Sequence, residues 1–157
     1  MDVTMNYRAL EASEYERFFS MMKEKTGTYL EPTLAAMGLD WSCLRDMVCA
    51  VGEVRVVDQE GVPVGFVWIE KRGSRLHVHG LVIDPVFRGR GIGSLVLRDL
   101  ESEFAGEADA IELGVHDSNH RARALYERLG FTLAETRNDV GFLIFRKPLD
   151  HDHRNAV

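Results

Sequence analysis

The middle of the chain reads as a strand, a glycine-rich turn and a helix, and this order constrains the fold more than any other feature. Residues 76–83 are rich in β-branched and apolar side chains, which predicts a strand that Pro85 ends. Three glycines follow within 89–93, and apolar residues then recur at helical spacing over 92–104. Such a turn presents several backbone N–H groups at the positive end of a helix, so we expect a phosphate site here.

Two common phosphate-binding motifs do not fit this turn. The P-loop needs Lys followed by Ser or Thr after its last glycine, whereas Gly93 is followed by Ser94 and Leu95. The dinucleotide fingerprint G-x-G-x-x-G needs a glycine where the chain has Ser94 or Val96. A nucleotide-binding enzyme that uses the glycine loop in another way and a glycine-rich turn without function remain as alternatives.

The pattern that does fit is Arg88-x-x-Gly91-x-Gly93, which matches the acyl-coenzyme A signature [QR]-x-x-G-x-[GA]. Through this motif the chain resembles the GNAT superfamily of N-acetyltransferases. The resemblance implies acetyl-CoA (coenzyme A) as co-substrate, with no metal, and a pyrophosphate held by the backbone amides of the loop. The cofactor-binding residues that it implies in the loop are Arg88, Gly89, Arg90, Gly91, Ile92, Gly93 and Ser94. On the preceding strand, it implies backbone pairing of Leu81, Val82 and Ile83 with the pantetheine arm.

A second motif begins at Asn119 and continues through Tyr126 to Gly130 and Phe131. From the residues alone, Asn119 is a good helix N-cap, Tyr126 lies on the expected buried face of that helix, and Gly130 ends it. The resemblance adds a cofactor contact for Asn119 and the role of general acid for the departing thiolate for Tyr126. Capping alone explains Asn119 equally well.

Two histidines precede the cofactor loop. Gly73-Ser74 predicts a type II′ hairpin whose register places Glu70 opposite His77, on the same strand face as His79. An amine acceptor is protonated at neutral pH, so a base with the pKa of histidine suits the reaction. We expect Glu70 to orient His77 and raise its pKa, or to be the base itself.

The arylalkylamine acetyltransferases resemble this sequence in having His-x-His before the loop, where the pair is thought to relay the proton. The pair could equally be two structural histidines of the sheet, and the resemblance does not establish an arylalkylamine substrate. His116, which follows the strand 110–115, is a third candidate base, and we expect His120 to be exposed.

The order of elements is strand, helices, three-strand meander, helix, strand, helix and hairpin. It indicates an α/β (α+β) fold with a mixed, mostly antiparallel sheet of six to seven strands and helices on both faces. The arrangement is similar to the GNAT fold, in which two central parallel strands splay apart. Near the N-terminus, a capping box at Ser13 and Glu16 predicts a helix to about Lys25, ended by Gly27, and a separate short helix follows Pro32.

The length of 157 residues fits one acyl-CoA N-acyltransferase domain, expected over 1–149, with a frayed polar tail at 150–157. The net charge of −6 argues against a nucleic-acid partner. The chain has no membrane-spanning apolar run and no signal-peptide pattern. Cys43 and Cys49 lack metal or redox spacing, so we expect a cytoplasmic protein with reduced thiols.

These features predict an N-acetyltransferase that moves an acetyl group to a small amine or peptide amino group by direct transfer in a ternary complex. A covalent acyl-cysteine route is disfavoured because both cysteines are far from the motifs in sequence. Acidic residues favour a cationic acceptor, and the contributors we expect are Glu31, Asp40, Glu53 and Glu70. A non-catalytic acyl-CoA sensor is the alternative, and family resemblance leaves a homodimer open.

Overall fold

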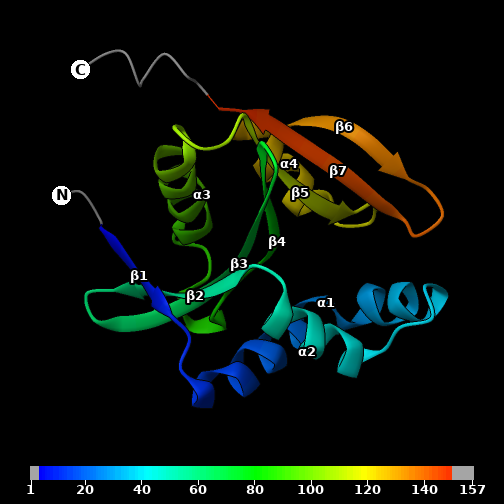
Figure 1. Ribbon diagram of the computed structural model, residues 1–157, viewed down its shortest axis with the longest axis horizontal. Helices are drawn as coiled ribbons and strands as arrows, with labels where there is room; N and C mark the ends of the chain where they lie inside the picture. Colours follow the sequence, from blue (N-terminus) through cyan, green and yellow to red (C-terminus); the bar gives the residue numbers. More distant parts are fainter. Residues whose placement is uncertain (1–3, 150–157) are drawn as a thin grey trace. The chain divides into compact units, whose positions relative to one another are not determined.

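The computed structural model describes residues 4–149, except the side chains of residues 28 and 29 (Figure 1). The tail expected at 150–157 lies outside the described residues. The elements in chain order are β1 (Met5–Ala9), η1 (Ala12–Glu14), α1 (Tyr15–Ala36), α2 (Trp41–Ala50), β2 (Glu53–Gln59), β3 (Val62–Arg72), β4 (Arg75–Ile83), η2 (Pro85–Phe87), α3 (Ile92–Phe104), β5 (Ala110–His116), α4 (His120–Arg128), β6 (Thr132–Arg137) and β7 (Phe142–Pro148).

The strands form a seven-stranded sheet in the order β1-β2-β3-β4-β5-β7-β6. Strands β4 and β5 run parallel, whereas β1–β2, β2–β3, β5–β7 and β6–β7 are antiparallel. The β4–β5 ladder ends at the pair Val78–Leu113, although β4 continues to Ile83 and β5 to His116. The expected mixed, mostly antiparallel sheet with two central strands that stop pairing is therefore confirmed.

The chain divides into two compact units that both draw on β3, β4 and α3. Unit 1 contains the chain up to Ile69 together with Gly80–Arg98. Unit 2 contains Glu70–His79 and the chain from Asp99 onward. The glycine loop therefore belongs to unit 1, and the histidine pair belongs to unit 2.

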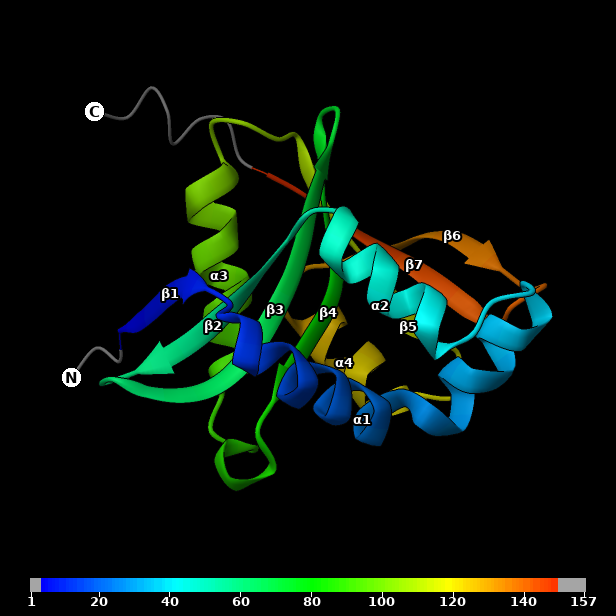
Figure 2. The same cartoon turned by 60° about the horizontal axis from the view of Figure 1, so that its bottom comes forward.

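In unit 1, α1 and α2 cover one face of β2 and β3. Figure 2 shows the two helices in front of these strands and the beginning of α3 behind them. The centre of the covered face is Phe18, whose ring lies 5.6 Å from that of Phe66 in an edge-on arrangement. Val57 and Val67 directly follow strand residues that pack under these helices. Since successive strand residues point to opposite faces, both valines lie on the other face of the sheet, where they are also fully buried. Burial of both strand faces explains why β2 and β3 are so rich in apolar residues.

The α1 helix is longer than the sequence predicts. It runs without interruption through Gly27 and Pro32, so the expected stop at Gly27 and the separate helix after Pro32 are wrong. The expected capping box is also displaced, because it forms between Glu11 and Glu14 at η1. The buried residues of α1 explain the continuity: packing of Phe18 and its neighbours outweighs the helix-breaking preferences of one glycine and one proline.

In both hairpin turns of the meander, a glycine adopts a positive φ angle. Gly73 has a φ of +57° in the two-residue loop between β3 and β4, while Ser74 does not have a positive φ, as a type II′ turn requires. The preceding turn also has two residues, since β2 extends to Gln59 and only Glu60 and Gly61 connect it to β3. Both of these turn residues have positive φ, at 53° and 80°.

Unit 2 has its own core around β5, β7 and the segment that follows α4. Ile111, Phe131 and Phe145 are almost completely buried there. The predicted hairpin at the end of the chain forms, with β6 paired to β7. Gly130 has a φ of +95°, and the Phe131 amide donates to the Tyr126 carbonyl oxygen at 2.9 Å, which confirms the predicted helix stop.

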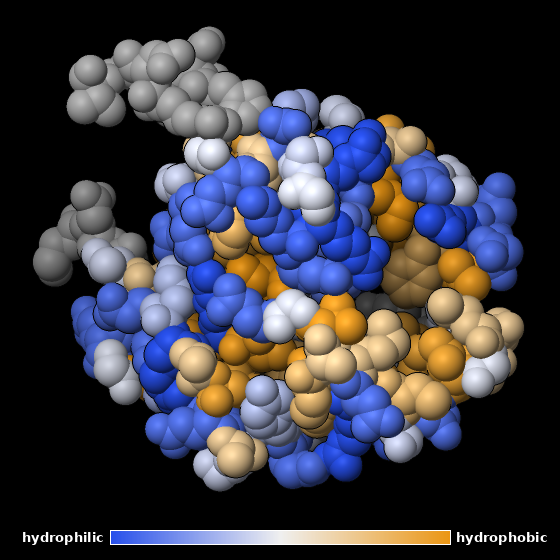
Figure 3. Space-filling model, in the orientation of Figure 1, coloured by the Kyte–Doolittle hydropathy of each residue, from blue (hydrophilic) through white to orange (hydrophobic). Residues whose placement is uncertain are grey.

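Few large apolar side chains are exposed among the described residues. Figure 3 shows apolar surface in the region where Figure 1 draws α2. Met37 and Met47 are exposed in the segment that comprises α1, α2 and their connection. Isolated apolar side chains of this kind are common on protein surfaces. Within residues 4–149, no helix combines the length and apolar character needed to cross a membrane.

Candidate active site

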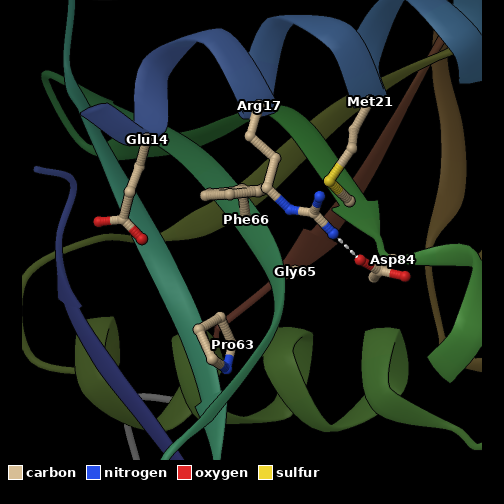
Figure 4. A pocket seen from close by; sticks show the side chains of 7 residues that line it. All are labelled: Glu14, Arg17, Met21, Pro63, Gly65, Phe66 and Asp84. Carbon is tan, nitrogen blue, oxygen red and sulfur yellow. Dashed lines mark hydrogen bonds and ion pairs between the residues drawn. The ribbon is translucent and has the colours of Figure 1, made fainter. Parts of the chain in front are cut away.

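Asp84 fixes the junction between β4 and the glycine loop. Its amide donates to the Val64 carbonyl oxygen at 2.9 Å, and its side chain accepts from the Val86 amide at 3.1 Å. Arg17 forms an ion pair with the same carboxylate. Figure 4 shows Arg17 reaching from α1 towards Asp84 beside Phe66, in a pocket of unit 1. Contacts from two other elements therefore set the direction in which the loop leaves β4.

The loop itself has the backbone of an anion cradle. Gly89 and Gly91 have φ angles of +78° and +76°, and a Cβ built at either position would have no neighbour within 4 Å. The Leu95 amide donates to the Gly91 carbonyl oxygen at 3.2 Å, so the helix begins at this glycine. The amides of the first turn have no acceptor within their own helix, and a helix N-terminus favours negative charge. The open space and these amides suit a phosphate group.

Two cations hold carbonyl oxygens of β4 close to this cradle. Lys25 Nζ lies 2.7 Å from the Leu81 oxygen, and Arg88 Nε lies 3.0 Å from the Ile83 oxygen. The Asp84 amide donates to β3. Backbone groups of successive strand residues point to alternate edges, so those of Leu81 and Ile83 point to the other edge of β4. Loss of water around the Lys25 ammonium, followed by repulsion from Arg88, lowers the pKa of Lys25. Sequence reasoning found Arg88 but missed Lys25, because nothing local links the middle of α1 to β4.

In unit 2, Glu70 contacts His79 rather than the expected His77. Its Oε1 atom lies 2.7 Å from His79 Nε2 and accepts from Arg72 Nε at 2.6 Å. Burial acts to raise the pKa of Glu70, but the hydrogen bonds with His79 and Arg72 lower it below the ordinary value. Glu70 is therefore a charged partner of His79.

His77 has a different carboxylate partner, Glu112 of β5. His77 Nδ1 lies 3.5 Å from Glu112 Oε2, and the two residues are Cα partners in the parallel ladder. Glu70 acts to raise the pKa of His77, as expected, but only weakly. The net shift is downward, because burial lowers this pKa and the attraction of Glu112 only partly opposes it. A lowered pKa keeps His77 neutral near pH 7, the state that a base requires.

The two imidazoles lie nearly parallel. Their ring centroids are 6.0 Å apart with an interplanar angle of 13°. The structure thus brings Glu70, His77 and His79 together, and adds Glu112, which sequence reasoning missed. The available signal was an acidic residue inside the otherwise apolar strand β5.

The second motif lies on α4 of unit 2. Asn119 Oδ1 accepts from the Ala122 amide at 3.2 Å, so its predicted role as N-cap is confirmed. The Tyr126 ring packs edge-on against Phe131 at 5.9 Å. Tyr126 is only half-buried, and no residue of α4 is fully buried, so the apolar face of this helix is less enclosed than predicted.

His116 and the cysteines complete the set of candidates. His116 Nδ1 lies 2.7 Å from Ser118 Oγ, and its ring meets Phe142 edge-on. His120 is exposed, as expected. Cys43 and Cys49 are both free thiols. Among residues 4–149, no group of three or more His, Cys, Asp or Glu side chains is arranged to hold a metal ion.

Comparison with known proteins assigns the family. The family model described as the acetyltransferase (GNAT) family matches residues 13–131, which is most of the chain. The chain belongs to the GNAT family. The match includes both the glycine loop and the helix that carries Asn119 and Tyr126.

Relatives within the GNAT family match over part of their length. The chain is 35% identical over 102 residues to a mycothiol acetyltransferase of Propionibacterium freudenreichii, which is 61% of this chain and 32% of that protein. It is 37% identical over 75 residues to the N-alpha-acetyltransferase RimI of Mycobacterium tuberculosis, which is 45% of this chain and 46% of that protein. The match thus spans about a third to a half of these two relatives.

Solved structures of GNAT proteins have the same fold. The PaiA N-acetyltransferase of Thermoplasma acidophilum, in complex with coenzyme A, has a TM-score of 0.69 at 16% identity, over 92% of this chain and 99% of that one. The ribosomal-protein-S18-alanine N-acetyltransferase of Escherichia coli has a TM-score of 0.67 at 19% identity, over 94% and 95% of the two chains. At such identities the likeness concerns the fold.

Proposed function

We propose that this protein transfers the acetyl group of acetyl-CoA to an amine. The observation that carries the proposal is the glycine loop, in which Gly89 and Gly91 adopt left-handed φ angles immediately before α3. The Cβ of any other residue would project from the loop into open space. Membership of the GNAT family supports acyl-CoA as the ligand of this loop.

The proposed cofactor site uses backbone groups more than side chains. Arg88 and residues 89–94 would hold the pyrophosphate, and Leu81, Val82 and Ile83 would pair with the pantetheine arm as an added strand. The two edge-facing carbonyls of this segment accept hydrogen bonds from Lys25 and Arg88, and each oxygen has a second lone pair for a further donor. The Asn119 side-chain amide group has donors beyond its capping oxygen and is proposed to contact the cofactor.

The proposed chemistry needs a base and an acid. Acetyl-CoA supplies an activated thioester. A base, for which His77, His79 and Glu70 are the candidates, removes a proton from the acceptor ammonium, and the amine nitrogen then attacks the acyl carbon. The C–N bond forms as the C–S bond breaks, and Tyr126 is proposed to donate a proton to the departing thiolate. No covalent acyl-enzyme is needed.

The acceptor is proposed to be a small amine or a peptide amino group. The relatives include a mycothiol acetyltransferase and an N-alpha-acetyltransferase, so both classes belong in a test. The acidic net charge of the chain supports a cationic acceptor. We further propose a cytoplasmic protein that acts as a single domain over 1–149, and a homodimer is the assembly to test.

An amine panel tests the proposal directly. Release of free thiol from acetyl-CoA is measured with small polyamines, aminoglycosides, arylalkylamines and peptides with free N-termini. Turnover that depends on the amine is the expected result. Tight binding of coenzyme A without turnover on any amine would favour an acyl-CoA sensor instead.

A thermal-shift comparison tests the ligand of the loop separately. Coenzyme A should raise the melting temperature more than ATP or NAD does, because a ligand stabilises the fold in proportion to its occupancy. Greater stabilisation by ATP or NAD would contradict the proposed cofactor and favour a nucleotide-binding enzyme.

A further inference from the structure

The carboxylate of Glu112 is buried in the middle of β5, with only 6% of its side chain exposed. A buried carboxylate is costly unless its oxygens are paired. Its two oxygens have different partners. Oε1 accepts from Arg146 Nε at 2.5 Å and pairs with Arg75 Nη1 at 3.0 Å, while Oε2 faces His77 Nδ1 at 3.5 Å. The two arginines therefore hold the carboxylate in place, and one oxygen is directed to the imidazole.

This arrangement favours one of the two His77 nitrogens as the carrier of the proton. A carboxylate accepts hydrogen bonds and does not donate them, so the imidazole nitrogen that faces it is the N–H. Neutral His77 is therefore expected to carry its hydrogen on Nδ1 and its lone pair on Nε2.

His79 is held in the opposite way. Its Nε2 atom lies 2.7 Å from Glu70 Oε1, so by the same reasoning the hydrogen of neutral His79 is on Nε2. Each of the two stacked rings thus faces its own carboxylate, His77 through Nδ1 and His79 through Nε2. This difference separates two histidines that the sequence pattern treats alike.

We propose that Glu112 is a positioning residue that fixes His77 as the Nδ1–H tautomer and thereby makes His77 Nε2 the base. The inference rests on the proposed N-acetyltransferase function. In the proton transfer, an N–H bond of the acceptor ammonium breaks and an N–H bond forms at Nε2. The resulting imidazolium keeps its Nδ1–H on Glu112, whose negative charge stabilises it, and later returns the proton to solvent.

Several charges influence His77 besides Glu112. The groups are Glu70 and Arg72 of β3, Arg75 and His79 of its own strand, and Arg146 of β7, which acts through Glu112. Arg72 and His79 oppose protonation of His77, and Glu70 favours it more weakly than Glu112 does. Glu112 is thus the principal negative charge acting on this ring.

The tautomer of His77 can be measured in the wild-type protein without any assay of turnover. Long-range ¹H–¹⁵N correlation spectra of the imidazoles, assigned with His77→Ala and His79→Ala, distinguish the protonated nitrogen from the unprotonated one. We expect Nδ1–H for neutral His77 and Nε2–H for neutral His79. An Nε2–H tautomer for His77 would overturn the proposal, and this measurement stands even if the protein turns over none of the amines.

Glu112→Gln and Glu70→Gln are matched variants, because each replaces the carboxylate that faces one of the two histidines. Glu112→Gln should lower the pKa of His77, because the negative charge that favours its protonation is removed, and should leave the His79 tautomer unchanged. Glu70→Gln should act mainly on His79. If turnover is found, the acid limb of kcat/KM should move to lower pH in Glu112→Gln by the same amount.

A merely structural Glu112 would give a different pattern. It would reduce the melting temperature of the Glu112→Gln variant while the His77 titration and the acid limb stay where they are in the wild type. That result in a folded variant would also overturn the proposal. If Glu112→Gln does not fold, the wild-type tautomer decides the question alone.

Discussion

Gly65 of β3 and Val82 of β4 approach so closely that a Cβ at position 65 would lie 2.5 Å from the Val82 carbonyl oxygen. Since that neighbour is backbone, it cannot rotate away. Gly65→Ala should therefore destabilise the protein by roughly 1–3 kcal/mol, measured by urea unfolding. Gly80→Ala is the matched control, because its Cβ would meet Met22 and Trp68 at ordinary contact distances of 3.7 and 3.9 Å. Equal stability of the two variants would contradict the close approach.

Gly91→Glu should weaken binding of coenzyme A by about tenfold or more, measured by isothermal titration calorimetry. The substitution places a negative charge beside the cradle amides and forces a side chain into a left-handed φ of +76°. Gly73→Glu carries a similar backbone penalty at a φ of +57° in the β3–β4 turn. It should leave the affinity unchanged. Undiminished affinity in Gly91→Glu would refute the assignment of this loop.

Replacing both His77 and His79 by Ala should lower the rate most at low pH. Above its lowered pKa, His77 stays unprotonated and can accept a proton, whereas the fraction of free amine acceptor falls about tenfold for each pH unit below its own pKa. The ratio of wild-type to variant kcat/KM should therefore grow as the pH falls towards the pKa of His77. A ratio that is constant with pH would remove the histidines from the proton transfer.

Lys25 should titrate at lower pH in the folded protein than in the urea-unfolded chain, because its ammonium loses water and is repelled by Arg88. Competitive acylation with acetic anhydride, followed by peptide mass spectrometry, measures this titration. Arg88→Gln should raise the pKa of Lys25 part of the way back. The folded state releases this proton more readily than the unfolded chain does, so the contribution of Lys25 to stability increases with pH between the two pKa values. Identical titration in both states would contradict the contact.

Glu60→Asn should stabilise the protein by roughly 0.5–1 kcal/mol. Glu60 and Gly61 both have positive φ, as in a type I′ turn, and Asn-Gly is the preferred pair for that turn. The melting temperature should rise in Glu60→Asn and stay close to that of the wild type in Glu60→Gln, which removes the same charge without favouring the left-handed backbone. An equal rise in both variants would assign the effect to charge.

Local signals in the sequence were sufficient at one helix cap, one helix end and one hairpin turn. The side chain of Asn119 caps α4, Gly130 ends it, and Gly73 turns the hairpin before β4, all as predicted. In each case the backbone requirement is met by residues within a few positions, so no knowledge of distant contacts is needed. The fold class followed from the order of these elements and from the family resemblance.

Contacts between distant segments could not be predicted in the same way. Gly27 and Pro32 predicted a break in α1, but packing of this helix against β2 and β3 outweighs their local preference. The partner of His77 depends on the register of β4 with β5, which a parallel connection through α3 does not encode locally. For the same reason the predicted site did not include Lys25 and Glu112. The structure places both of these charged side chains against residues of that site, Lys25 against Leu81 and Glu112 against His77.

The two cations on β4 have a consequence for the behaviour of the chain in a crowded solution. An open strand edge is a template on which another polypeptide can add a strand, and such additions begin aggregation. Past the end of the ladder with β5, the Leu81 and Ile83 carbonyl oxygens are occupied by Lys25 and Arg88, whose positive charges also repel an incoming basic segment. A ligand with amide donors and negative phosphates satisfies the carbonyls and attracts the cations. The same edge can therefore discourage self-association and still serve as the proposed site for the cofactor.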